Sequence, residues 1–272
     1  MLRRLLNLGR RPAPRDDISV IICSVDEERF RKVSANFGER MGVGAYEMIR
    51  IADAKSLAEG YNRGLTQARG DIVIFSHDDI EILTPDFRQR LFGHLQHFDL
   101  VGLAGTSRLL DASWNTAGQP WVHGQSVQPA RSGQGYVVDI YGQAEQLAQP
   151  NVQALDGMFI AARRAAATAL RFDAQMFDAF HVYDIDFSYR AYLARMRVAI
   201  ANDILIYHGS LGNFDDAWRR YAAVFQEKYA AVLDKRPPGV PTLHAREPVR
   251  NMDEAMKLFN YYLRQCGLAE TA

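Results

Sequence analysis

The sequence has few of the features that mark several large classes of protein. Its two cysteines in 272 residues, Cys23 and Cys266, lie far apart and form neither a disulfide framework nor a metal-binding pair. No apolar run approaches the roughly 18–20 residues that a membrane-spanning helix needs. The apolar stretch at residues 5–9 is too short and too broken for a secretory signal. These absences predict a cytoplasmic protein.

A net charge is also absent. The chain has 32 Lys and Arg against 32 Asp and Glu, which argues against nucleic acid as a partner. The basic residues gather at one place, because residues 1–15 hold five arginines and no acid. At about 1 kcal/mol each beside an anionic lipid surface, these arginines suffice for weak contact with the inner face of a membrane. The alternative is a solvated tail, and we expect residues 1–16 to lie outside the folded domain.

Glycine-rich phosphate loops are missing as well. The first apolar strand leaves through Cys23-Ser24-Val25-Asp26, and neither G-x-G-x-x-G nor G-x-x-x-x-G-K-[ST] follows it. Those loops hold phosphates at a helix N-terminus, so their absence argues against Rossmann and P-loop proteins. Neither G-x-S-x-G nor H-E-x-x-H occurs, which argues against the hydrolases that carry those motifs.

Alternating short apolar runs and helical stretches are present. With 48% hydrophobic and 24% charged residues, the chain has the composition of a globular protein with a sizeable core. The alternation predicts an α/β domain with a mostly parallel central sheet and flanking helices. We expect strands at 18–23, 46–51, 71–76 and 100–104, and helices at 27–40, 56–69 and 84–98. The second of these helices opens with Ser56-Leu57-Ala58-Glu59, which has the form of a capping box.

The alternation breaks at residues 105–154, where Gly, Gln, Ser, Trp and Tyr dominate. So long an irregular stretch indicates a binding surface or a hairpin insertion, and not a linker inside a domain. Order then returns, with a strand at 155–161, a helix at 183–195, short strands within 198–207, and helices at 215–233 and 252–266. The expected organisation is a tail (1–16), one domain (17–214) and a C-terminal helical segment (215–272).

Two adjacent acids, Asp78 and Asp79, come directly after the third strand. Open α/β sheets bind ligands at the carboxyl ends of their strands. Because two close carboxylates repel each other, a divalent cation is a natural way to keep both ionised. Mg²⁺ and Mn²⁺ held in this way complete their coordination with water and substrate phosphate oxygens. The alternative is a solvated turn.

Several of these segments together resemble the family 2 glycosyltransferases of the GT-A fold. They occur in that family's order and spacing over about residues 17–210. The matching segments are 18–24, Gly60-Tyr61-Asn62-Arg63-Gly64, 68–75, His77-Asp78-Asp79 and 180–190. The resemblance implies a GT-A-type nucleotide-diphospho-sugar transferase fold, in which residues 105–154 form an insertion on the acceptor side.

The resemblance also implies roles for individual residues. Asp79 would bind Mn²⁺ or Mg²⁺, and Asp184 would be the catalytic base. Tyr183 stands where the family has an acid before that base, which leaves the base in place and changes its electrostatic surroundings. The residues implied for donor binding are Cys23, Ser24, Asp53, Asn62, Asp78, Asp156 and Gly157.

The histidines and aromatic residues have alternative interpretations. His208 is either a structural residue or, as in some family members, a second metal ligand. We expect His77 and His181 to support other ligands or to face the acceptor, and Asp186 to be a first-turn acid of a helix. The aromatic residues of the insertion either stack on an acceptor sugar or pack on the sheet: Trp114, Trp121, Tyr136 and Tyr141.

The implied function is metal-dependent transfer of a sugar, with inversion, from a nucleoside-diphosphate sugar to a hydroxyl of a glycan, polysaccharide or glycoconjugate. A UDP-sugar is the favoured donor. Two alternatives stay open. A nucleotidyltransferase also uses paired acids and a cation, but residues 23–29 lack its phosphate loop. A non-catalytic nucleotide- or carbohydrate-binding module would not need Asp184.

Overall fold

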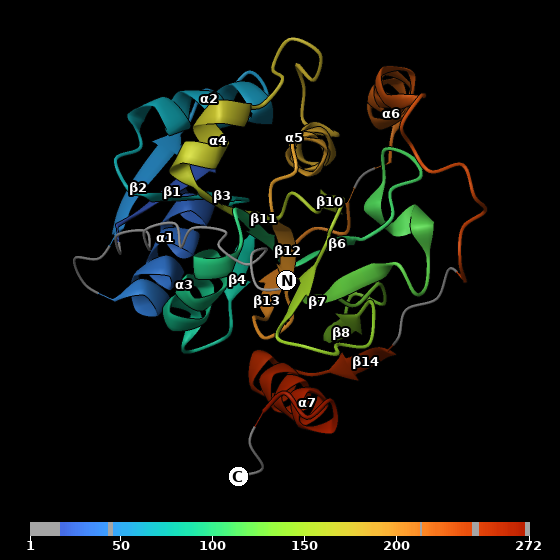
Figure 1. Ribbon diagram of the computed structural model, residues 1–272. Helices are drawn as coiled ribbons and strands as arrows, with labels where there is room; N and C mark the ends of the chain where they lie inside the picture. The colour runs from blue at the N-terminus through green and yellow to red at the C-terminus, as the bar shows by residue number, and fades with distance from the viewer. Residues whose placement is uncertain (1–16, 43–45, 213, 241–244, 270–272) are drawn as a thin grey trace, which may run out of the picture.

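A computed structural model describes residues 17–42, 46–212, 214–240 and 245–269 (Figure 1). The arginine-rich tail that we expected to touch a membrane lies outside the described residues. The central sheet has the strand order β2-β1-β3-β11-β5-β12-β9. Its strands are β1 (Ile18–Cys23), β2 (Tyr46–Ile51), β3 (Ile72–Ser76), β5 (Leu100–Gly102), β9 (Ala148–Pro150), β11 (Phe159–Arg163) and β12 (Val198–Ala201).

The predicted α/β fold is confirmed. Strands β2, β1, β3, β5 and β12 share one direction, whereas β11 and β9 run against them. Every residue of β3 is buried, and its side chains alternate between the two faces of the sheet, with Val73 and Phe75 on one face and Ile72 and Ile74 on the other. Both faces are therefore covered, as the continuous apolar runs predicted.

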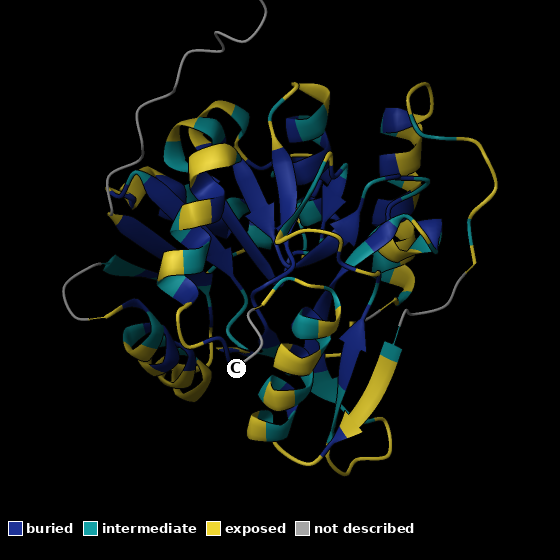
Figure 2. Cartoon of the chain, turned by 60° about the horizontal axis from the view of Figure 1, so that its bottom comes forward, coloured by how far each residue is buried: buried dark blue, intermediate teal, exposed yellow. Residues whose placement is uncertain are grey.

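Helices cover the two faces of this sheet (Figure 1). Side chains of α1 (Glu27–Met41) and α3 (Phe87–His97) pack on one face. Those of α2 (Leu57–Gln67), α4 (Arg164–Leu170), α5 (Tyr183–Leu193) and α6 (Asp216–Tyr229) pack on the other. The buried strands lie inside, and the helices expose their outer sides (Figure 2). None of the helices in the described part of the chain has both the length and the apolar character of a bilayer-spanning segment.

The start of α2 shows how local sequence positions a helix. The Ser56 hydroxyl accepts the Glu59 N–H over 3.0 Å, as expected for an N-cap. The Glu59 carboxylate, however, accepts the N–H of Lys55 and not that of Ser56. The predicted capping box therefore forms only in part: Ser56 caps the helix, but Glu59 bonds one residue before the position expected.

Residues 105–154 contribute strands to a second sheet, and two of these strands form a hairpin, so the expected hairpin insertion is present and the segment is not irregular throughout. The strand order of this sheet is β10-β6-β7-β13-β4, and β8 also pairs with β7. These strands are β4 (Ile80–Ile82), β6 (Ala104–Thr106), β7 (Val122–Pro129), β8 (Tyr136–Ile140), β10 (Ala154–Leu155) and β13 (Ile206–His208). The sequence of β7 is polar apart from Val122, Val127 and Pro129 and shows no apolar alternation. Pairing with β6, β8 and β13 stabilises it as a strand.

The C-terminal segment is helical only in part, which corrects a prediction. Helices α6 and α7 (Met252–Gln265) are where we expected helices. Between them, β14 (Ala245–Val249) pairs with β8, and α7 packs on this pair. Pro248 within β14 removes a donor from the ladder, as edge strands tolerate. The strand was not predicted from the sequence, because it is short and polar and contains a proline.

Candidate active site

The carboxyl ends of β1 and β3 lie side by side at one edge of the central sheet. The strands are parallel, with Ile22 opposite Ser76. Beyond them, the Ser24 hydroxyl donates to an Asp78 carboxylate oxygen over 2.7 Å. The Arg29 guanidinium, on α1, lies 3.9 Å from the other Asp78 oxygen. The structure thus joins two of the residues implied for donor binding, Ser24 and Asp78.

The other residues on this side have different contacts. Burial raises the pKa of the Cys23 thiol to about 12, which keeps it protonated. Asp53 is exposed and pairs with Arg63 over 2.8 Å. Both polar groups of the Asn62 side chain bond to the backbone of Phe172, over 2.8 and 2.9 Å. Asn62 therefore connects α2 to the segment after α4, and no described contact joins it to Asp78.

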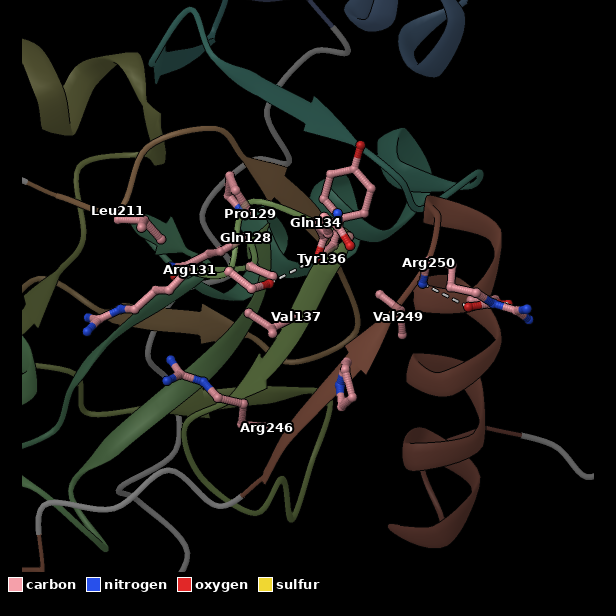
Figure 3. A pocket seen from close by; sticks show the side chains of 15 residues that line it. Gln128, Pro129, Arg131, Gln134, Tyr136, Val137, Leu211, Arg246, Val249 and Arg250 are labelled. Carbon is pink, nitrogen blue, oxygen red and sulfur yellow. Dashed lines mark hydrogen bonds and ion pairs between the residues drawn. The ribbon is translucent and has the colours of Figure 1, made fainter.

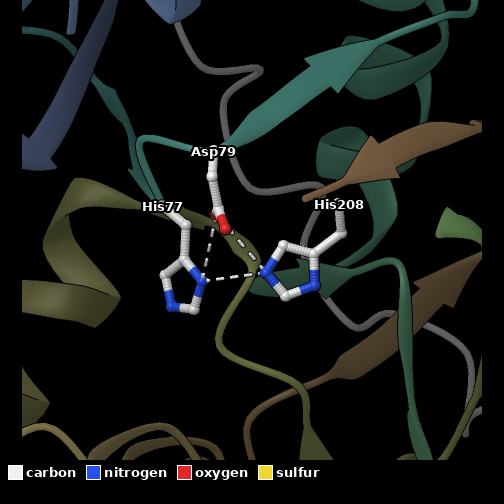
Figure 4. A group of neighbouring side chains, drawn as sticks. All are labelled: His77, Asp79 and His208. Carbon is white, nitrogen blue, oxygen red and sulfur yellow. Dashed lines mark hydrogen bonds and ion pairs between the residues drawn. The ribbon is translucent and has the colours of Figure 1, made fainter. Parts of the chain in front are cut away.

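Three side chains with ligand atoms meet just beyond β3 (Figure 4). His77 Nδ1 and His208 Nε2 are 3.2 Å apart, and an Asp79 carboxylate oxygen lies 3.5 Å from His208 Nε2 and 4.0 Å from His77 Nδ1. Two imidazole nitrogens and one carboxylate oxygen are a donor set that suits Mn²⁺. The residues fit a divalent cation, and His77 joins Asp79 and His208 in this group.

Strand pairing brings these residues together across more than a hundred positions. His208 lies opposite Ile80 in the antiparallel pair of β13 and β4. The Gly209 N–H donates to the Asp79 carbonyl over 2.8 Å, which closes the two strands at this end. Sequence reasoning could name Asp79 and His208, but it had no means of showing that β13 pairs with β4.

Tyr183, at the start of α5, holds His77. Its hydroxyl lies 2.8 Å from His77 Nε2, and only 4% of the residue is exposed. Burial, together with the neighbouring His208, lowers the pKa of His77. The neutral imidazole that this favours is the form that binds metals. The resemblance implies an acid at this position. The tyrosine found there instead contacts His77 through its hydroxyl.

Asp184 stands next to Tyr183 and beside the segment Asp156–Gly157. Burial and the negative charge of Asp156 raise the pKa of Asp184 to about 7. The Asp156 carboxylate is fixed by the Trp114 indole N–H and the Met158 N–H, each at 2.8 Å. A carboxyl group whose pKa is near neutral is suited to accept and release a proton.

Gly157 has no side chain, and the Tyr183 and Asp184 side chains occupy the space that one would fill. A β-carbon added at Gly157 would lie 2.4 Å from the Tyr183 hydroxyl and 2.9 Å from the Asp184 carboxylate. Only glycine therefore lets the backbone approach both side chains. This explains why Asp156-Gly157 occurs as a pair at this point in the chain.

Comparison with known protein families assigns this chain to one of them. A model of the glycosyltransferase-like family matches residues 19–229. The chain belongs to this family. It is a glycosyltransferase. No curated protein sequence matches it.

Solved structures share the fold of this glycosyltransferase. GalNAc-T7, in a crystal structure with UDP, GalNAc and Mn²⁺, superposes with a TM-score of 0.54 at 10% identity, over 78% of this chain and 47% of that chain. The mannosyltransferase PcManGT from Pyrobaculum calidifontis, in complex with GDP-Man and Mn²⁺, superposes with a TM-score of 0.50 at 13% identity, over 100% of this chain and 81% of that chain. The chain thus spans about half of GalNAc-T7, and the likeness confirms the predicted GT-A-type fold.

The glycosyltransferase has a cavity of about 820 Å³ next to the histidines and acids described above. His77, His208 and Asp184 line one part of it, and Trp114 lines another. Trp114 belongs to the short 3-10 helix η1 (Trp114–Ala117), within the segment that we expected to contact the acceptor. Its bond to Asp156 is a functional contact that the sequence did not reveal, because the two residues are 42 positions apart.

The two residues that we assigned to the acceptor differ in their positions. His181 lines the cavity and lies 3.5 Å from an Asp215 carboxylate oxygen. Trp121 is not among the lining residues, and its ring packs against the Arg108 guanidinium, 5.4 Å from its centroid. Tyr141 and Trp114 line the cavity instead, with ring centroids 4.9 Å apart.

Asp186 is a first-turn acid of α5, as expected, but its surroundings were not foreseen. It is fully buried, and its carboxylate accepts bonds from Lys228 (2.7 Å), Tyr229 (2.7 Å) and Arg190 (2.8 Å). Lys228 and Tyr229 lie at the end of α6, so Asp186 fastens that helix to α5. Its separation from Asp184 by two helical positions puts the two acids on different sides of α5.

Proposed function

We propose that this glycosyltransferase is a metal-dependent, inverting enzyme that moves a sugar from a nucleoside-diphosphate sugar to a hydroxyl of a glycan, polysaccharide or glycoconjugate. The observation that carries the proposal is one cavity lined both by Asp184, whose pKa is near 7, and by His77 and His208, two of the three side chains in the cation-type donor set. Both solved neighbours hold Mn²⁺ with a nucleotide or nucleotide sugar.

His77, Asp79 and His208 would hold the cation. When bound, Mn²⁺ or Mg²⁺ supplies positive charge that stabilises the departing diphosphate without a proton donor. Ser24 and Asp78 stand beside it, where they would bind the nucleoside part of the donor. Their fixed hydrogen bond means that little has to be reorganised when the donor binds.

Asp184 would take the proton from the acceptor hydroxyl as this oxygen attacks the sugar. A single carboxylate that deprotonates the nucleophile, opposite the leaving group, gives inversion at the anomeric carbon. Asp156 supports this role, because its charge raises the proton affinity of Asp184. Trp114 keeps Asp156 in place through its indole N–H.

Binding and turnover in two variants test the proposal. Calorimetric titration of UDP with and without Mn²⁺ is expected to show that Asp79→Ala abolishes the Mn²⁺-dependent part of the affinity. Asp184→Asn should bind UDP about as well as the wild type, and lose about 100-fold or more of its turnover. Glu81→Ala, an exposed acid on β4, is the matched control and should change neither.

The products separate the alternatives. Release of nucleoside diphosphate from a panel of nucleotide sugars, with UDP-sugars tested first, supports transfer. Release of pyrophosphate from a nucleoside triphosphate indicates a nucleotidyltransferase, and donor binding without release indicates a binding module. Equal UDP affinity in the wild type and Asp79→Ala would contradict the proposed metal site.

A further inference from the structure

A second cavity, of about 750 Å³, opens beside the first (Figure 3). The turn that joins β7 to β8 and the start of α7 line it, together with β14. Gln128, Arg131, Leu211 and Arg246 line both cavities, so the two hollows meet at these side chains. Together they offer more room than a nucleotide sugar alone requires.

The two ends of this combined space differ in charge. Asp156 and Asp184 line only the catalytic cavity, Arg131 and Arg246 lie where the two cavities meet, and Arg250 lines only the second one. Arg250 is paired with Glu254, over 2.7 Å. Arg131 is exposed, and no described acidic side chain forms an ion pair with it. Its charge is therefore available to a ligand.

Arg246 is held in place and still has donors to offer. Its Nε and Nη2 donate to the two oxygens of Asp139, over 2.6 and 2.8 Å, and Asp139 is fully buried. This bidentate pair fixes the guanidinium on β14. A guanidinium has five N–H groups, so those of Nη1 are not used by Asp139. In Figure 3 the side chains of Arg131 and Arg246 extend toward the same side of the cavity.

We propose that the second cavity binds the acceptor, and that Arg131 and Arg246 hold an anionic group on it, a carboxylate or a phosphate. This inference rests on the proposed function, because it assumes that an acceptor hydroxyl reaches Asp184. The acceptor lies with its hydroxyl at the acidic end and its anion between the two arginines. A forked guanidinium recognises both carboxylate and phosphate oxygens through paired hydrogen bonds.

The experiment compares matched probes on the full chain in the presence of Mn²⁺ and UDP. One pair is trigalacturonic acid and its neutral methyl ester, and the other is mannose 6-phosphate and mannose. Calorimetry or ligand-observed NMR measures affinity, and the two pairs distinguish a carboxylate from a phosphate. We expect an acidic probe to bind about tenfold more tightly than its neutral partner, and this preference to weaken with added salt.

Variants assign the preference to the arginines. Arg131→Gln should remove most of the preference for the acidic probe, and Arg131→Lys should keep part of it. Arg31→Gln, which replaces an equally exposed arginine on α1 outside both cavities, is the matched control and should keep all of it. Arg246→Ala is avoided as the first test, because it would leave buried Asp139 without its partner.

The outcomes separate this inference from the proposed function. If no acidic probe binds better than its neutral partner, or if Arg131→Gln keeps the full preference, the anion site is wrong. Mn²⁺-dependent UDP binding and donor cleavage would then be unaffected. If the proposed function is wrong, the wild type itself will show neither Mn²⁺-dependent UDP binding nor donor cleavage.

Discussion

Tyr183 stands where the resemblance to family 2 glycosyltransferases implies an acid. An acid there would add negative charge beside Asp184, whereas the tyrosine hydroxyl bonds to His77 Nε2. A hydrogen bond to one ring nitrogen orients the imidazole and leaves its other nitrogen, Nδ1, facing Asp79 and His208. Tyr183 is therefore a positioning residue for the cation site.

Replacing Tyr183 by phenylalanine tests this role. Loss of such an outer hydrogen bond typically costs 10–100-fold in metal affinity, and we expect Tyr183→Phe to weaken Mn²⁺ binding by about tenfold. Titration of Mn²⁺ followed by electron paramagnetic resonance measures the change directly. Tyr261→Phe, on the exposed side of α7, is the control. An unchanged Mn²⁺ affinity in Tyr183→Phe would show that His77 needs no such support.

The pKa of Asp184 predicts how activity depends on pH. Burial and Asp156 raise the pKa of this carboxyl to about 7, and only the deprotonated form accepts a proton. Activity should therefore be low below pH 7 and rise as pH increases through this value. A pH profile of kcat/KM between pH 5 and 9 measures the rise. A flat profile over this range would mean that Asp184 titrates elsewhere or is not the base.

Helix α5 carries chemistry on one side and structure on another. Tyr183 and Asp184 lie at its first turn, where Val182 has a left-handed backbone with φ of 64°. This conformation is unfavourable for a β-branched residue. Asp186, one turn in, binds Lys228 and Tyr229 of α6. The strained start and the buried anchor together determine where the base points.

Substituting Asp186 tests the anchor. Asp186→Asn would leave Lys228 and Arg190 without their buried counter-charge, and we expect it to lower the free energy of unfolding by about 3 kcal/mol. Asp216→Asn breaks an exposed pair with Arg219 and should cost less than about 0.5 kcal/mol. Urea unfolding measures both. A loss in Asp186→Asn no larger than in Asp216→Asn would contradict the proposed anchor.

At the scale of the whole molecule, the candidate active site lies where two sheets meet. Strand β3 belongs to the central sheet and β4 to the second, and only His77, Asp78 and Asp79 separate them. Because β4 pairs with β13, His208 arrives at this junction from the other sheet. The second sheet also contributes β8 and β14, which carry Asp139 and Arg246 at the edge of the acceptor cavity.

Much of this arrangement was accessible from sequence because it depends on neighbours in the chain. Continuous apolar runs, the Ser56 cap and the acids after β3 predicted the α/β order and the cation side of the site. The positions of the strands within 105–154 were not predicted and β14 was missed, since polar residues form strands there only through distant partners. The same holds for His77, whose ligand atom is defined by contacts with Tyr183 and His208.

By itself, the sequence determined the α/β alternation of the first part of the chain and the placement of Asp78 and Asp79 at a strand end, and it named Asp184 as the expected base. Each of these depends on periodicity or on motifs within a few residues. Only the tertiary structure decided that His77 and His208 join Asp79, that Tyr183 replaces an acid by a hydrogen bond, and that Asp186 is an anchor. The physical reason is that charge, burial and ligand geometry depend on distances in space, which strand pairing between remote segments creates.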